Sequence, residues 1–228
     1  LSDFYFIEQK EPEAIHQLIH ALIYERIPKR FGLHFPDDIQ ILTPMQKGPL
    51  GAQFLNNFLQ SNYHTQQSSQ LAISGKYFRT HDKVMQIVNN YDKQVYNGDI
   101  GRIIHIDEVS KRVVVSYQEQ EVTYEQNELD ELVLAYATTV HKAQGSEFKA
   151  VIMPVSMSHY VMLERNLIYT AMTRARQLLI LVGDTKALKK ASRTLTAYER
   201  CTHLSNQLDL AMRAVCDNLT NKSEHSNL

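Results

Sequence analysis

Residues 135–148 read Ala-Tyr-Ala-Thr-Thr-Val-His-Lys-Ala-Gln-Gly-Ser-Glu-Phe. Apolar runs lie on both sides, from Leu132 to Ala137 and from Ala150 to Val155. The pattern predicts a strand, a tight turn with a short helix, and a second strand. Helix capping would explain a threonine and Gly145, but not the other polar residues of this turn. Because open α/β sheets bind ligands beside strand ends, we expect a functional site here.

The chain has 228 residues, is 43% hydrophobic and carries a net charge of −1. This length suits one large domain, or one domain with a small insert. No overall positive charge attracts it to nucleic acid, so any contact with DNA requires a local patch. Cys201 and Cys216 have the spacing of neither a disulfide framework nor a zinc site. We expect a cytoplasmic protein without a membrane partner, since no signal peptide or membrane span is recognisable.

Strand and helix patterns alternate at both ends of the chain and predict an α/β fold. The expected strands are Asp3–Glu8, Asp38–Thr43, Val151–Val155 and Leu178–Val182. Helical spacing predicts a helix from Pro12 that ends before Pro28, another around Phe54–Leu59, and a third from Leu163 to Arg176. The polar stretch from Asn56 to Gly75 is predicted to be a linker.

Other features of these helices are less informative. His16 and His20 are four residues apart, a spacing that suits zinc, but no third ligand accompanies them, so we expect no metal site. The chain from Lys186 is predicted to be helical, with a frayed end from Asn218 to Leu228. It begins at Leu1 without a methionine, in a segment that is predicted to be a strand, so we expect a piece of a longer protein.

Short β-rich runs dominate the middle of the chain. They are Lys83–Asn89, Asp99–Asp107, Lys111–Tyr117 and Glu121–Tyr124. Asn97-Gly98 predicts a tight turn, and four or five short strands predict a small SH3-like barrel. Asp130-Glu131 is not a Walker B pair, because the apolar residues follow the acids, and we expect a solvated strand entry there.

Two segments resemble motifs of the RecD-like branch of superfamily 1 helicases. Thr139-Val140-His141-Lys142-Ala143-Gln144-Gly145-Ser146-Glu147-Phe148 resembles motif V, and Arg165-Asn166-Leu167-Ile168-Tyr169-Thr170-Ala171-Met172-Thr173-Arg174-Ala175 resembles motif VI. Residues 82–101 and the loop Pro44–Gly51 also resemble that family. Family members usually have glycine before the aspartate at 82, where this chain has His81, so the local turn is an open question. The resemblance extends from about Asp3 to Leu188.

This resemblance implies a discontinuous RecA-like motor domain at 1–75 and 128–228, with an SH3-like barrel inserted at 76–127. It implies the C-terminal motor half of an ATP-dependent DNA helicase that moves 5′ to 3′ on single-stranded DNA and serves repair or recombination. ATP and Mg²⁺ would be bound mainly by an N-terminal RecA-like domain of the same protein. The sequence has no Walker A or Walker B motif, so we expect this chain to be inactive alone.

The resemblance also assigns roles to individual residues. Arg174 would be the catalytic arginine finger and contact the nucleotide, because an always charged, planar guanidinium suits a transferring phosphoryl group. Gly145 and Glu147 would approach the nucleotide, with Glu147 toward the ribose. Arg165 and Arg176 would be structural or rim charges.

Single-stranded DNA would be contacted from two loops. The expected contacts are Thr139, His141 and Lys142 in the motif V turn, and Thr43, Lys47 and Gly48 around the Pro44–Gly51 loop. Short polar side chains and backbone amides give contacts that do not depend on base sequence, as a translocating motor requires.

The sequence is also compatible with two other functions, each of which a motif argues against. A non-enzymatic module would bind nucleic acid or protein through the barrel and keep the RecA-like part as a scaffold, but a scaffold does not need Arg174 at a cleft. A complete NTPase is nearly excluded by the missing phosphate loop.

Overall fold

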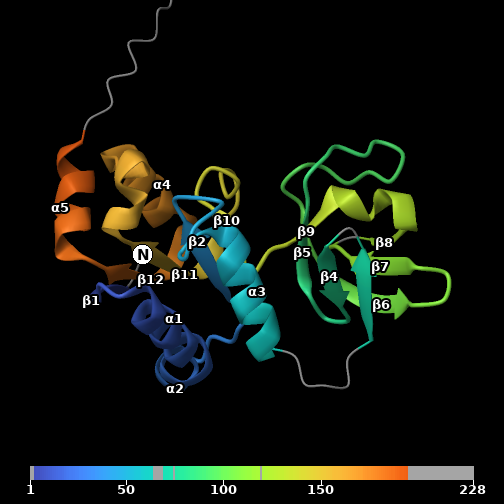
Figure 1. Ribbon diagram of the computed structural model, residues 1–228, viewed down its shortest axis with the longest axis horizontal. Helices are drawn as coiled ribbons and strands as arrows, with labels where there is room; N and C mark the ends of the chain where they lie inside the picture. The colour runs from blue at the N-terminus through green and yellow to red at the C-terminus, as the bar shows by residue number, and fades with distance from the viewer. Residues whose placement is uncertain (1–2, 64–68, 74, 119, 195–228) are drawn as a thin grey trace, which may run out of the picture. The chain divides into compact units, whose positions relative to one another are not determined.

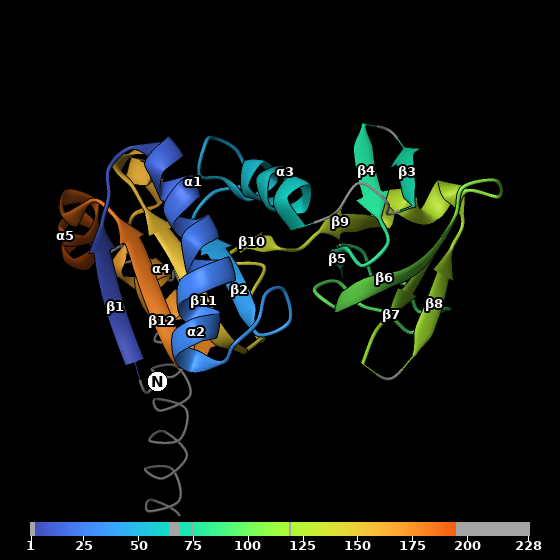
Figure 2. The ribbon, with the colours of Figure 1, turned by 90° about the horizontal axis from the view of Figure 1, so that it is seen from below.

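The structure is a computed structural model, which describes residues 3–63, 69–73, 75–118 and 120–194. Two five-stranded sheets carry most of the strands (Figures 1 and 2). Three predictions lie outside the described residues: the two cysteines, the frayed end from Asn218, and residues 64–68 of the expected linker.

The first sheet is parallel throughout and has the strand order β1-β12-β11-β2-β10. Its strands are β1 (Asp3–Glu8), β2 (Ile39–Thr43), β10 (Ala137–Thr139), β11 (Phe148–Val155) and β12 (Ala175–Gly183). All four strands predicted for the α/β part lie in it. The expected α/β fold with a RecA-like parallel sheet is therefore confirmed.

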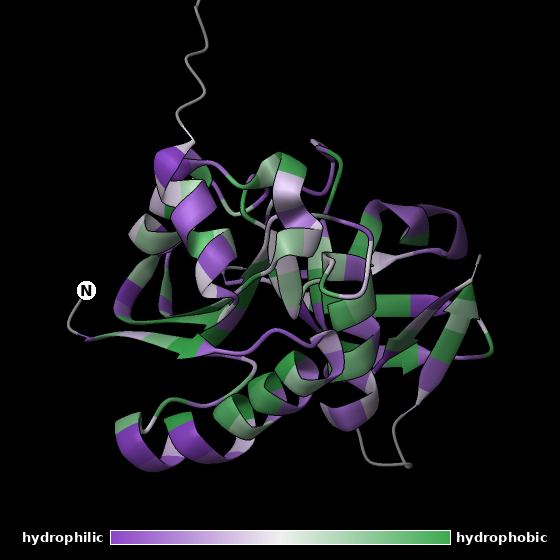
Figure 3. Cartoon of the chain, turned by 60° about the vertical axis from the view of Figure 1, so that its left-hand side comes forward, coloured by the Kyte–Doolittle hydropathy of each residue, from purple (hydrophilic) through white to green (hydrophobic). Residues whose placement is uncertain are grey.

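Helices cover both faces of this sheet (Figure 1). One face packs against α1 (Pro12–Ala21), the π-helical turn η1 (Leu22–Arg26), α2 (Ile27–Phe31) and α3 (Ala52–Tyr63). The other face packs against α4 (Arg165–Arg174) and α5 (Thr185–Arg193). Alternation along each strand explains the two cores, because Ile41 and Ile180 face one layer while Leu42 and Leu179 face the other. The helix ribbons accordingly show both green and purple bands in Figure 3.

The second sheet is antiparallel and has the order β8-β7-β6-β5-β9. Its strands are β5 (Lys83–Gln86), β6 (Ile100–Asp107), β7 (Arg112–Ser116), β8 (Glu121–Tyr124) and β9 (Leu132–Leu134). A hairpin of β3 (Gln70–Ile73) and β4 (Lys76–Arg79) shares its core through Leu71 and Phe78. This unit is the expected SH3-like part.

The apolar run from Leu132 to Ala137 divides between the two sheets. β9 pairs with β5, whereas β10 pairs with β2. The bends at Ala135 and Tyr136 are fully buried, so the run stays apolar although it changes partner. The division at residues 127 and 128 stays a prediction, but antiparallel pairing continues to Leu134.

Several local predictions were wrong. The first helix does not end before Pro28, because the π-turn shifts the hydrogen-bond register and Pro28 enters at the start of α2, which ends at Gly32. The expected linker contains most of α3 and all of β3, and its polar residues Asn56 and Gln60 are buried and hydrogen-bonded on the helix. By contrast, the expected strand entry at Asp130-Glu131 is confirmed, since the pair ends the 3₁₀ turn η2 (Gln126–Glu131) and directly precedes β9.

The turn before Asp82 keeps its left-handed backbone without a glycine. His81 has φ +74, and its N–H donates to the carbonyl oxygen of Ile103 at 2.7 Å. Asn97-Gly98 also turns, with φ +104 at Gly98, but it lies within a longer connection from β5 to β6.

Candidate functional site

The motif V turn is a chain of consecutive hydrogen-bonded turns and not the short helix expected. The N–H of Ala143 donates to the Thr139 carbonyl oxygen at 3.1 Å, and the Lys142 N–H lies 3.4 Å from the Thr139 hydroxyl. Val140 and Ala143 are buried and anchor the turn in the core. Gly145 has φ +88, a conformation that glycine adopts without strain. The exposed residues are His141, Lys142, Gln144, Gly145 and Glu147.

The loop after β2 lies beside this turn, because Thr139 pairs with Thr43 in the parallel sheet. Lys47 and Gly48 are exposed on the loop, and Gly48 has φ +98. A Cβ at Gly51 would lie 2.4 Å from the Lys47 carbonyl oxygen, so the loop closes tightly there. The structure thus brings Thr139, His141 and Lys142 to the same side of the sheet as Lys47 and Gly48, where the parallel strands end.

Thr43 does not fit its expected role as a DNA contact through its side chain. It is fully buried, and its hydroxyl donates to the carbonyl oxygen of Leu50 at 2.6 Å. This bond holds the loop that carries Lys47 and Gly48. Thr43 therefore supports exposed residues and does not face solvent itself.

Gly145, Glu147 and Arg174 lie at the opposite side of the sheet, where the parallel strands begin. Gly145 and Glu147 directly precede β11, Arg174 directly precedes β12, and Phe148 pairs with Ala175. Because all strands of the sheet run the same way, the turn crosses from the carboxyl end of β10 to the amino end of β11. The single cluster expected at a strand end is thus two groups joined by one turn.

Arg174 is partly buried and held by the turn. Its Nη1 donates to the Ser146 carbonyl oxygen at 3.0 Å, and its Nη2 to the Thr173 hydroxyl at 3.2 Å. Its Nε is buried and has no hydrogen-bond partner in the described part of the chain. A guanidinium with an unsatisfied N–H can still bind an oxyanion.

Glu147 has a partner of its own. Nε of Arg176 lies 2.7 Å from Glu147 Oε2, and both side chains are about half exposed or more, at 49% and 66%. Exposed ion pairs contribute about 1 kcal/mol or less, so a ligand can displace this one. The pair fits the expectation that Arg176 is a rim charge.

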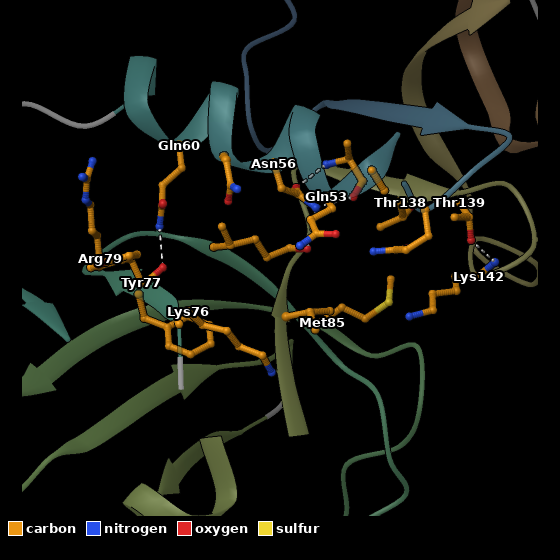
Figure 4. Close-up of a pocket in the computed structure, with 18 residues that line it drawn as sticks. Gln53, Asn56, Gln60, Lys76, Tyr77, Arg79, Met85, Thr138, Thr139 and Lys142 are labelled. Atoms are coloured by element: carbon orange, nitrogen blue, oxygen red, sulfur yellow. Dashed lines mark hydrogen bonds between the residues drawn. The ribbon is translucent and has the colours of Figure 1, made fainter. Parts of the chain in front are cut away.

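A pocket of about 510 Å³ extends from the end of β10 to strand β4 (Figure 4). The pocket has two opposite sides, here called banks. The first bank is made of Thr138, Thr139 and Lys142, and the second of Lys76, Tyr77 and Arg79. Helix α3 contributes the amides of Gln53, Asn56, Asn57 and Gln60. None of the described residues that line it is an aspartate or glutamate.

The sequence reading missed the bank on β4 and the amides on α3. Lys76 donates to the carbonyl oxygens of Asp130 and Leu132, and burial lowers its pKa from the ordinary value. Tyr77 is 58% exposed, so its ring is accessible. The signal that could have found the α3 amides is their spacing at positions 53, 56, 57 and 60, which lie on one helical face.

A second pocket, of about 570 Å³, lies beside Ser146 and Glu147. Its lining includes three carboxylates, Asp37, Asp99 and Glu147, and the buried amine of Lys83. Burial lowers the pKa of Lys83 to about 8, and its Nζ donates to the Pro36 carbonyl oxygen at 2.9 Å. Three carboxylates make this pocket a poor match for phosphates, in contrast to the first.

The comparisons agree with both parts of the fold. Residues 134–182 match the UvrD-like helicase C-terminal domain, and residues 55–117 match the ATP-dependent RecD-like DNA helicase SH3 domain. This chain belongs to the RecD-like helicases. It corresponds to their C-terminal part, as the motifs in the sequence indicated.

The relatives that this RecD-like chain matches are longer than the chain itself. It is 38% identical over 157 residues to the ATP-dependent RecD2 DNA helicase of Deinococcus radiodurans, a match that covers 69% of the chain and 22% of that protein. It is 28% identical over 206 residues to the RecBCD enzyme subunit RecD of Buchnera aphidicola, covering 82% and 33%. The match thus spans a third or less of the length of either relative.

A Pif1 helicase from Bacteroides, solved with ADP-AlF₃ and ssDNA, shares the fold of this RecD-like chain. The TM-score is 0.53 at 16% identity, over 89% of this chain and 50% of that one. No helix in the described part of the RecD-like chain is long and apolar enough to cross a membrane.

Proposed function

We propose that this chain is the C-terminal motor half of an ATP-dependent RecD-like DNA helicase that moves along single-stranded DNA. The observation that carries the proposal is the turn 140–147. One of its ends joins Thr139 and the exposed Lys142, and the other meets Arg174 through Ser146. A turn with such ends can connect DNA contact at one sheet edge with nucleotide contact at the other.

The DNA side is the pocket of Figure 4, with Lys47 and Gly48 at the same sheet edge. Lys76, Arg79 and Lys142 can neutralise backbone phosphates, and Tyr77 can stack on a base. The exposed amides of Gln53 and Asn57 on α3 can bond sugar or phosphate oxygens without reading the base sequence. His141, exposed beside Lys142, is a further candidate contact in this group.

The nucleotide side is the group of Gly145, Glu147 and Arg174. Once its side chain turns out of the position that buries Nε, Arg174 can bind a phosphoryl oxygen, and Glu147 can accept from a ribose hydroxyl. By resemblance to RecD-like helicases, we assign Mg²⁺ and most contacts to ATP to an N-terminal motor domain, and we propose that this chain is inactive without it.

The proposed coupling uses the bond between Arg174 and Ser146. ATP, when bound, supplies the free energy of phosphoryl transfer. When Arg174 turns toward the phosphates, it leaves the Ser146 carbonyl oxygen, and the turn is free to shift Thr139 and Lys142 along the strand. Movement 5′ to 3′ belongs to the same proposal and is measured with partial duplexes that carry single-stranded tails at one end or the other.

Binding of this chain to single-stranded DNA tests the DNA side. Fluorescence anisotropy with labelled oligothymidylate is measured across a salt series. Three phosphate contacts give a slope of log K against log salt of about −2, since each contributes about −0.7 on single strands. Lys76→Ala/Arg79→Ala is expected to bind more weakly and to reduce the magnitude of that slope, so that it becomes about −0.7.

A matched control is Lys189→Ala/Arg193→Ala, which removes the same charge from exposed positions of α5, away from the pocket. It is expected to bind as the wild type does. Equal losses in both double variants would contradict the assignment of the pocket. Thr139→Ala/His141→Ala separates the readings, because binding that depends only on the β4 bank would favour the non-enzymatic module.

A further inference from the structure

Helix α3 presents two buried amides on one face. Asn56 and Gln60 are four residues apart, and only 6% and 5% of their surfaces are exposed. Both belong to the lining of the pocket in Figure 4, where they lie between its two banks. Asn56 bonds to both ends of the segment that joins β9 to β10, and Gln60 bonds to the segment that joins β4 to β5 and to β4 itself.

Asn56 holds the parallel sheet. Its Nδ2 donates to the carbonyl oxygens of Leu134 and Ala137 at 3.0 and 2.9 Å, and its Oδ1 accepts from the Ala137 N–H at 2.8 Å. Ala137 opens β10, the strand that ends at Thr139. Asn56 therefore fixes α3 to the strand that carries the first bank.

Gln60 holds the antiparallel unit. Its Nε2 donates to Asp82 Oδ2 at 2.6 Å and to the Tyr77 carbonyl oxygen at 2.9 Å. Asp82 Oδ2 also accepts from the Arg79 N–H at 2.7 Å. Gln60 and Asp82 thus bind the backbone of β4 at Tyr77 and Arg79, the residues of the second bank.

Asp82 is fully buried and reaches the parallel sheet as well. Its Oδ1 accepts from the Tyr136 hydroxyl at 2.8 Å, one residue before β10 begins. Burial and the Asp82 charge raise the pKa of Tyr136. A buried carboxylate with several donors is costly to disturb, so this connection is rigid.

We propose that Asn56, Gln60 and Asp82 form a tie that sets the distance between the two banks of the pocket. This inference rests on the proposed function, in which that pocket carries single-stranded nucleic acid. Gln60 and Asp82 would then be positioning residues, because they hold the groups that contact phosphates and bases. Two half-sites at a fixed spacing bind one strand much more tightly than either half-site alone.

The test compares affinity for a short and a long oligothymidylate. The lengths are about 4 and about 12 nucleotides, within the range for one binding fold. The wild-type chain is expected to bind the long strand more tightly. Gln60→Leu, which keeps the bulk of the side chain but removes its donors, is expected to lose about tenfold on the long strand and little on the short one.

Two further variants separate positioning from general destabilisation. Ile103→Val trims the core of the antiparallel sheet, where Ile103 is fully buried, and is expected to keep the length dependence. Tyr136→Phe removes one donor to Asp82 but keeps the ring that stacks on Phe35. This variant is expected to lose part of the length dependence of binding. A folded Gln60→Leu or Tyr136→Phe with wild-type length dependence would overturn the proposal.

Hydrogen exchange tests the tie without DNA. Gln60→Leu cuts α3 from β4 and is expected to speed exchange of the Ala137 N–H, at the other end of the tie. An exchange rate of the Ala137 N–H that does not change in Gln60→Leu would overturn the proposed tie. If the wild type binds neither oligonucleotide, the proposed function fails, and the exchange experiment alone decides the tie.

Discussion

Arg174 donates from Nη1 to the carbonyl oxygen of Ser146 at 3.0 Å, which joins the end of α4 to the turn before β11. The bond uses a backbone acceptor, so it does not depend on the side chain at position 146. It holds the guanidinium in place while its Nε stays unsatisfied among the described residues. Arg174 is thus restrained, and its side chain has to turn before the buried Nε can meet a further oxygen.

Arg174→Ala, made in a protein that includes the proposed N-terminal motor domain, is expected to lose DNA-stimulated ATP hydrolysis by about 10³-fold or more. Single-stranded DNA binding should be nearly unchanged, because Arg174 lies at the other sheet edge. Steady-state hydrolysis and anisotropy measure the two effects. Arg174→Lys keeps the charge but not the planar fork, and is expected to recover little. Near-normal turnover of the alanine variant would refute the finger role.

His81→Gly is expected to stabilise the chain by about 0.5–1 kcal/mol, because glycine adopts the φ of +74 there without steric cost. His81 is exposed, so little packing is lost. Urea denaturation followed by circular dichroism measures the change. His81→Ala is the control, since it removes the imidazole but keeps a Cβ. Equal stabilities of the alanine and glycine variants would show that the turn is unstrained.

The stability of the chain should depend on Lys83 at alkaline pH. Its folded-state pKa is about 8, below the ordinary value of 10.5, because burial disfavours the charged amine. The unfolded chain then binds more protons between these values, so this group's contribution to stability rises from pH 8 to about 10.5, by up to about 3 kcal/mol.

Lys83→Met removes this titration, and urea denaturation at a series of pH values compares the two proteins. The wild type should gain stability relative to the variant as the pH rises. Parallel stability curves would mean that Lys83 keeps its ordinary pKa in the folded state.

Gly51→Ala should destabilise the loop after β2. The added Cβ would meet the Lys47 carbonyl oxygen at 2.4 Å, and backbone cannot yield as a flexible side chain does. The expected loss is about 1–3 kcal/mol in thermal or urea unfolding. Gly48→Ala tests a neighbouring glycine with open space around its Cβ but φ +98, so only backbone strain should appear there. A harmless Gly51→Ala would mean that the loop has room to rearrange.

Much of the parallel sheet could be predicted, because its strands are long apolar runs such as Leu178–Val182, which only a buried strand explains well. The sequence predicts a linker over most of helix α3, because the face of the helix that lines the pocket is made of amides, and amides are also typical of loops. The division of Leu132–Ala137 between two sheets had no local signal, since both halves are equally apolar. Pairing partners depend on the whole fold and not on the segment.

The candidate site, too, could be predicted from the sequence only in part. The turn 140–147 and Arg174 were found from their residue types and their resemblance to known motifs. The bank of Lys76, Tyr77 and Arg79 was not, since its residues are ordinary for an exposed strand and only the structure places them opposite Thr139. The position of Thr43 predicts a contact with DNA, but its hydroxyl donates to the carbonyl oxygen of Leu50.

The two bonds of Asn56 to Ala137 of β10 also affect how copies of this chain meet. β10 is the last strand of its sheet, and the outward-facing N–H and C=O of Ala137 would otherwise be open to pairing with a strand from another molecule. The amide of Asn56 occupies both groups, as a neighbouring strand would. Asn56 therefore protects the chain against strand-to-strand aggregation, and its loss would lower solubility even where folding survives.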